Sequence, residues 1–120
     1  MTNPFAEQSE FMRACDQSTD DMNQDQYSMY LSLIKEEVQE LDEACEDNDP
    51  VEQLDALIDI LVVTIGAINS MGADGEGAWN EVMRTNFAKI DPETGKVRKR
   101  EDGKVLKPEG WTAPELEQYL

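Results

Sequence analysis

The stretch LSLIKEEVQELDEACEDNDPVEQLDALIDILVVTIGAI, residues 31–68, decides the fold. Apolar side chains recur in its first half every three or four positions, which is the period of one face of a helix. The members of this series are Tyr30, Ile34, Val38, Leu41 and Cys45. The period predicts a helix over residues 26–46.

A second helix is predicted to begin directly after the first. Asp49 is suited to cap it, Pro50 to occupy its first position, and Glu52 to complete a capping box. The apolar pattern continues to about Ser70, and Gly72 ends it. Because only a few residues separate the two helices, we expect them to pack antiparallel.

The flanking sequence adds shorter elements. Residues 5–17 and 78–89 carry helical patterns, whereas residues 102–103 read Asp-Gly between apolar neighbours, which is a hairpin signal. The expected fold is therefore all-α, a four-to-five-helix bundle with a short C-terminal hairpin or irregular tail. We expect a single domain over residues 1–120, with its core in residues 5–90 and the tail in residues 91–120.

Composition narrows the class of protein. The 120 residues carry 27 acidic and 10 basic side chains and a net charge of −17, which argues against a nucleic-acid partner. Histidine is absent, so any catalysis must rest on carboxylates, amines or metal. No apolar run is long enough to cross a membrane and the start does not read as a secretory signal, so we expect a cytoplasmic protein without a membrane partner. Cys15 and Cys45 are expected to be small buried side chains.

Acidic residues follow helical spacing on both central helices. Glu36, Glu37 and Glu40 lie within one turn of the first helix. On the second helix, three acids share a face: Glu52, Asp55 and Asp59. If the helices pack antiparallel, the two stripes converge, and hard oxygen ligands in this number suit Mg²⁺ or Mn²⁺.

Asp59 is conspicuous because its helix is strongly apolar. A buried carboxylate is costly unless it is paired, hydrogen-bonded or bound to a metal. The apolar side chains cover well over half the circumference of this helix, which is therefore expected to be largely buried. They are Leu54, Leu57, Ile58, Leu61, Val62, Ile65 and Ile68.

Residues 31–44 and 54–63 resemble the all-α NTP pyrophosphatases, the MazG-like and phosphoribosyl-ATP pyrophosphohydrolase-like superfamily. The pattern of that superfamily is E-x-x-E on one helix and E-x-x-D on the next. Glu37 and Glu40 match the first pair, and Asp59 matches the final aspartate. Ala56 stands where the second glutamate is usual, so either Asp55 or Glu52 would supply the remaining carboxylate.

This resemblance implies a MazG-like helical domain and a metal-assisted hydrolysis of an NTP or dNTP to the monophosphate and pyrophosphate. The implied metal ligands are Glu37, Glu40, Asp55 and Asp59, with Mg²⁺ as the cofactor and Mn²⁺ as a substitute. Glu36 or Glu40 would orient the attacking water. A homodimer or homotetramer is also implied.

A second match lies toward the C-terminus. Residues 79–89 resemble the phage-type members, whose helix ends in an N-x-x-K element, and residues 102–111 resemble the segment that follows it. The resemblance implies that Asn86 and Lys89 approach the triphosphate, and Lys104 and Lys107 could add a cationic rim.

Several functions stay open at this point. The enzyme would act in nucleotide-pool control, with dGTP or dATP as a sharper possibility among phage-type members. One alternative is phosphoribosyl-ATP hydrolysis. The alternative from a different class is a non-catalytic acidic helical module, such as a DNA mimic, which would need dispersed acids and no metal.

Overall fold

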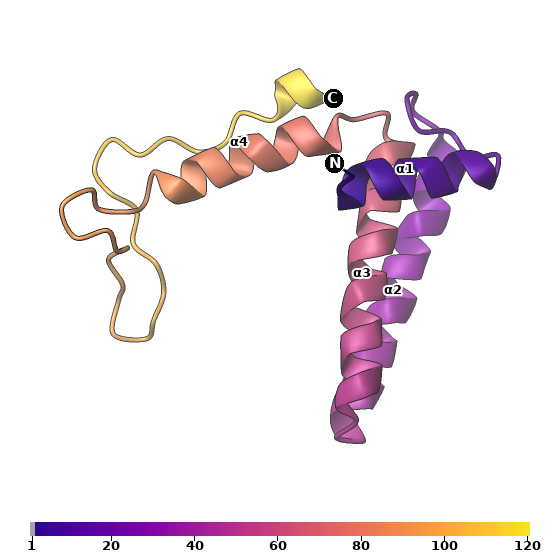
Figure 1. The fold of residues 1–120 in the computed structure, drawn as a ribbon, viewed down its shortest axis with the longest axis horizontal. Coiled ribbons are helices and arrows are strands. Elements are labelled where there is room, and N and C mark those ends of the chain that lie inside the picture. The colour runs from indigo at the N-terminus through magenta and orange to yellow at the C-terminus, as the bar shows by residue number, and fades with distance from the viewer. Residues whose placement is uncertain (1) are drawn as a thin grey trace. The chain divides into compact units, whose positions relative to one another are not determined.

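The computed structural model describes residues 2–120, which form two compact units (Figure 1). The first unit comprises the described residues up to Gly75 together with Leu120, and the second comprises Glu76–Tyr119. The described residues contain four α-helices and one short 3-10 turn, and no extended strand, which confirms the predicted all-α class. The elements are α1 (Pro4–Ala14), α2 (Gln24–Glu46), α3 (Pro50–Ser70), α4 (Gly75–Phe87) and η1 (Glu117–Tyr119).

The helix starts follow from local capping. The side chain of Asn3 accepts a hydrogen bond from the first turn of α1, and that of Asn23 does the same for α2. Asp49 accepts from the backbone N–H groups of Val51 and Glu52, so the predicted start of α3 is confirmed. These bonds satisfy N–H groups that have no partner inside the helix.

The predicted start and end of α4 were wrong by a few residues. The helix begins at Gly75 instead of residue 78 and ends at Phe87 instead of residue 89. Gly75 is buried, and a Cβ added to it would lie 2.9 Å from Ile68 and 3.0 Å from Phe5. Close packing in the first unit therefore requires glycine here and outweighs its weak helix propensity.

α2 and α3 form the central hairpin of the first unit, and they run side by side in opposite directions (Figure 1). The aromatic ring of Tyr30 on α2 lies against the backbone of Gly66 on α3, and a Cβ at Gly66 would lie 2.7 Å from Tyr30 Cζ. The hydroxyl of Tyr30 donates a hydrogen bond to Gln17 Oε1. Tyr30, Met12 and Ala67 form the buried core of this unit.

The expectation that α3 is largely buried was wrong for the single chain. Two of its most buried side chains are small: Ala56 is 3% and Ala67 5% exposed, and Ala67 packs in one cluster with Tyr30 of α2. Most of its larger aliphatic side chains lie on the other face, where they remain open to solvent. The exposed fractions are 62% for Leu54, 48% for Leu57, 50% for Ile58 and 58% for Leu61. We refer to these four residues as the α3 apolar stripe.

Both cysteines are exposed, so their predicted burial was also wrong. Cys15 follows the end of α1 as its C-cap, and Cys45 lies in the last turn of α2. No single helix in residues 2–120 is long and apolar enough to cross a membrane.

The second unit joins α4 to an irregular tail. The predicted hairpin turn is confirmed as a short antiparallel pairing of Lys99 with Val105, in which the N–H of Arg100 donates to Lys104 O at 2.8 Å. Gly103 has a φ of 89°, which explains the glycine at this turn. A second isolated bridge joins Ile90 and Val97.

Candidate functional site

Glu37 lies in the stripe of α2 that packs against α3. The side chains one turn to either side, Ile34 and Leu41, are partly buried, and Tyr30 and Ala44 extend the buried stripe. Glu37 Oε2 is completely buried and has no hydrogen-bond partner among the described residues. An orphaned carboxylate oxygen in a helix contact is costly, so it calls for a proton or a cation.

Three further carboxylates lie close to Glu37. Burial raises the pKa of Glu37 above its usual value of 4.5, and the negative charges of Glu40 and Asp59, with a side-chain contact to Glu40, raise it further. Asp55 adds to this effect from α3. The structure therefore brings acids of α2 and α3 to one side of the helical hairpin. Asp59 is half-buried, whereas Glu40 and Asp55 are exposed.

The chemistry of these donors fits a hard divalent cation. All four are carboxylates, and the buried oxygen of Glu37 lacks any other partner. Within residues 2–120, however, no three acidic side chains are already arranged to hold a metal ion. Binding would therefore require the acidic side chains to rearrange around the ion, although the carboxylate of Glu40 already contacts that of Glu37.

The remaining predicted acids lie apart from this group. Glu36 is exposed and does not influence the pKa of Glu37. Glu52 is exposed in the first turn of α3, where its backbone N–H donates a hydrogen bond to Asp49. It is not among the residues that shift the pKa of Glu37. Ala56 is buried. The acid that accompanies Asp59 near Glu37 is thus Asp55.

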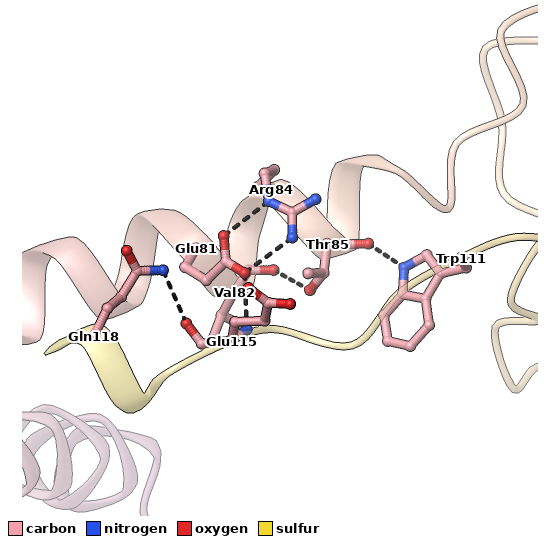
Figure 2. A network of polar contacts seen from close by, with 7 residues as sticks. All are labelled: Glu81, Val82, Arg84, Thr85, Trp111, Glu115 and Gln118. Carbon is pink, nitrogen blue, oxygen red and sulfur yellow. Dashed lines mark hydrogen bonds and ion pairs between the residues drawn. The ribbon is translucent and has the colours of Figure 1, made fainter. Parts of the chain in front are cut away.

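The second unit contains a polar network that no pattern in the sequence indicated (Figure 2). Glu81 accepts two hydrogen bonds from the guanidinium of Arg84, at 2.8 and 2.9 Å, and a third from the N–H of Glu115 at 2.8 Å. Arg84 and then the N–H of Glu115 lower the pKa of Glu81 to about 2. The indole N–H of Trp111 donates to Thr85 O at 2.6 Å. Together these bonds hold the tail along α4.

The predicted cationic residues gather around Trp111, with one exception. Lys89 Nζ donates a hydrogen bond to Asn86 Oδ1 at 3.1 Å. It also lies 5.1 Å from the ring centre of Trp111. Lys107 Nζ lies 4.8 Å from the same ring centre. Both distances are in the range of a cation–π contact. Lys104 is exposed at the hairpin turn, where its N–H donates to Asp102.

Fold and site together define a class: an all-helical protein with carboxylates gathered on two antiparallel helices. The model of the phosphoribosyl-ATP pyrophosphohydrolase family matches residues 7–86, which are two thirds of the chain. The chain belongs to this family, and the resemblance to the all-α NTP pyrophosphatases is confirmed. The family indicates a hydrolase that acts on acid anhydrides in nucleotides. No curated protein matches the sequence.

Proposed function

We propose that the chain is a Mg²⁺-dependent nucleoside triphosphate pyrophosphohydrolase, which converts an NTP or dNTP and water to the monophosphate and pyrophosphate. The observation that carries this proposal is the buried, unpartnered Glu37 Oε2 beside three other carboxylates. Such an arrangement is costly for the isolated protein, and a divalent cation would offset the cost. Control of the nucleotide pool is the role that we propose for it.

The carboxylates of Glu37, Glu40, Asp55 and Asp59 would hold Mg²⁺, with Mn²⁺ as a substitute of similar ligand preference. The bound ion would neutralise charge on the phosphate oxygens and lower the pKa of water. Glu40 and Glu36 are both exposed, so either carboxylate could accept a proton from the attacking water. Glu40 is favoured because its carboxylate lies next to Glu37.

Cationic and amide side chains of the second unit are proposed to meet the phosphates. They are Asn86, Lys89, Lys104 and Lys107. The amide oxygen of Asn86 already accepts a hydrogen bond from Lys89, so Asn86 would act by orienting this lysine. A cation near the phosphate chain stabilises the negative charge that develops on the leaving pyrophosphate.

Phosphoribosyl-ATP is the second candidate substrate, and the family match favours it. The same carboxylates would serve, because this reaction also separates a nucleoside monophosphate from pyrophosphate. What differs is recognition of the base: phosphoribosyl-ATP carries a bulky sugar phosphate on its adenine. Activity on both substrates would indicate an open base site.

A second copy of the chain is the proposed partner. The α3 apolar stripe exposes four aliphatic side chains along one face of a single helix. A surface of this kind on a small protein favours association. We propose a homodimer or a homotetramer in which this stripe is covered by its counterpart.

Release of pyrophosphate, measured over the eight common NTPs and dNTPs and phosphoribosyl-ATP, tests the function. We expect activity with Mg²⁺ and none in EDTA, with dGTP and dATP as the preferred substrates. Glu40→Gln and Asp59→Asn should each lower kcat by about a hundredfold or more. Asp42→Asn is the matched control, because Asp42 is an exposed acid on α2 away from the group. Activity that survives Glu40→Gln combined with Asp59→Asn would refute the site.

A further inference from the structure

The last four backbone carbonyls of α4 all accept a hydrogen bond, although a helix end leaves such groups without partners inside the helix. Three of them accept from the backbone N–H groups of the three residues that follow the helix. The fourth, Thr85 O, accepts from the indole N–H of Trp111 at 2.6 Å (Figure 2). A side chain of the tail therefore completes the C-terminal cap of α4.

The ring of the same side chain contacts two cations. Lys89 Nζ lies 5.1 Å and Lys107 Nζ 4.8 Å from the ring centre of Trp111. Lys89 lies just after α4 and Lys107 in the tail, so one ring holds ammonium groups from both segments. Among residues 2–120, neither lysine forms an ion pair. An ammonium group has three N–H donors, so contact with a ring on one side leaves donors for an anion.

Trp111 is itself fixed in place. Its indole is partly buried, and the hydrogen bond to Thr85 O sets the position of the ring relative to α4. Lys89 is held a second time, because its Nζ donates to Asn86 Oδ1 on α4. A lysine side chain is flexible and loses much rotamer freedom when it binds a ligand. Contacts that already restrict the side chain lower this cost.

We propose that Trp111 is a positioning residue for the phosphate chain of the substrate. It touches no substrate atom itself and acts by holding the ammonium groups of Lys89 and Lys107. The inference rests on the proposed function, which assigns these two lysines to the phosphates. Trp111 lies outside residues 7–86, the part of the chain that the family model matches.

Steady-state hydrolysis by the full chain with Mg²⁺, on the nucleotide that it cuts best, tests this role. Two cation–π contacts at a partly exposed site are together worth about a tenfold change in an equilibrium constant, so Trp111→Leu should lower kcat/KM by about tenfold. Trp111→Phe keeps an aromatic ring and should lower kcat/KM by less than about threefold. Leu116→Ala is the control, because Leu116 is an exposed apolar side chain of the same tail, and it should leave kcat/KM unchanged.

A double-mutant cycle separates positioning from general support of the fold. In a chain that carries Lys89→Met and Lys107→Met, no ammonium group remains for the ring to hold. Adding Trp111→Leu to this chain should then change kcat/KM by less than about twofold. A loss of the same size in both backgrounds would overturn the proposal, and so would equal losses in Trp111→Phe and Trp111→Leu.

NMR reads the positions of the lysines without catalysis. The ring current of Trp111 should shift the side-chain ε-proton signals of Lys89 and Lys107 upfield of the signal of Lys99, which is exposed on the hairpin. The shift should persist in Trp111→Phe and vanish in Trp111→Leu; its absence from the wild type would overturn the proposal. Failure of the proposed function looks different. A wild type that hydrolyses no nucleotide refutes that function and the role of the lysines with it, whereas unchanged kcat/KM in Trp111→Leu removes only the positioning role.

Discussion

Replacing Glu37 by Gln tests two effects of the buried carboxylate separately: the stability that its charge costs the fold, and the stability that it provides by binding Mg²⁺. The pKa of Glu37 is raised, so between pH 4.5 and that pKa the native state binds more protons than the unfolded state. The free energy of unfolding therefore falls as pH rises through this window. Gln has no charge to bury, so in EDTA the variant should be more stable than the wild type at neutral pH. The two proteins should converge in acid.

The size of the effect follows from the orphaned oxygen. An unsatisfied buried polar group costs about 1–3 kcal/mol. Because Gln keeps one polar atom at this place, we expect the variant to gain about 1 kcal/mol, or about 4 °C in Tm for a chain of 120 residues. Mg²⁺ at about a hundred times its Kd should stabilise the wild type by about 2.7 kcal/mol, or about 10 °C. The variant should gain much less, so Mg²⁺ should reverse the order of stability.

Thermal unfolding followed by circular dichroism, between about pH 5 and pH 8 with EDTA or MgCl₂, measures both effects. Asp42→Asn controls for the loss of one negative charge, because Asp42 is exposed on the same helix. The reasoning is refuted if Glu37→Gln is the less stable protein in EDTA at neutral pH, or if it keeps the full stabilisation by Mg²⁺.

Other substitutions test the packing and the tail. Gly66→Ala should lower the free energy of unfolding by about 1–3 kcal/mol, since its Cβ would clash with Tyr30; urea titration measures this, and no loss would contradict the contact. Leu57→Glu combined with Leu61→Glu should give a monomer in analytical ultracentrifugation, whereas an unchanged mass would exclude the α3 apolar stripe as the interface. Glu81 has a pKa of about 2 and stabilises the tail contact above its usual pKa of 4.5, losing this effect only as pH falls through about 2. Tryptophan fluorescence should therefore stay constant from about pH 8 to pH 5, while Glu81→Gln should shift it at every pH.

The helical hairpin could be predicted because its signals are local. The apolar period, the cap at Asp49 and the proline that follows are all contained in one short stretch. Burial of α3 could not be predicted in the same way. Hydrophobicity shows which side chains avoid water, but it does not show whether α2 or a second copy of the chain covers them. The buried side chains of α3 include small ones such as Ala56 and Ala67, and Ala67 packs in one cluster with Tyr30 of α2.

The acids of the candidate site were found by spacing, but their environments were not. The apolar character of its helix predicted that Asp59 would be the buried carboxylate, whereas the fully buried oxygen belongs to Glu37. The available signal was the position of Glu37 between Ile34 and Leu41 in the stripe of α2. The hydrogen bond by which Trp111 holds the tail could not be predicted from the sequence. Its acceptor is the backbone carbonyl of a residue 26 positions earlier, and every residue type has this group.

The α3 apolar stripe has a consequence for every stability measurement on this protein. If unfolding also separates copies of the chain, the midpoint of a melting curve rises with protein concentration by mass action. Dilution would then destabilise the fold without any change in sequence or buffer. Variants of Glu37 and Gly66 should accordingly be compared at one protein concentration, and a dilution series of the wild type would itself report the affinity between subunits.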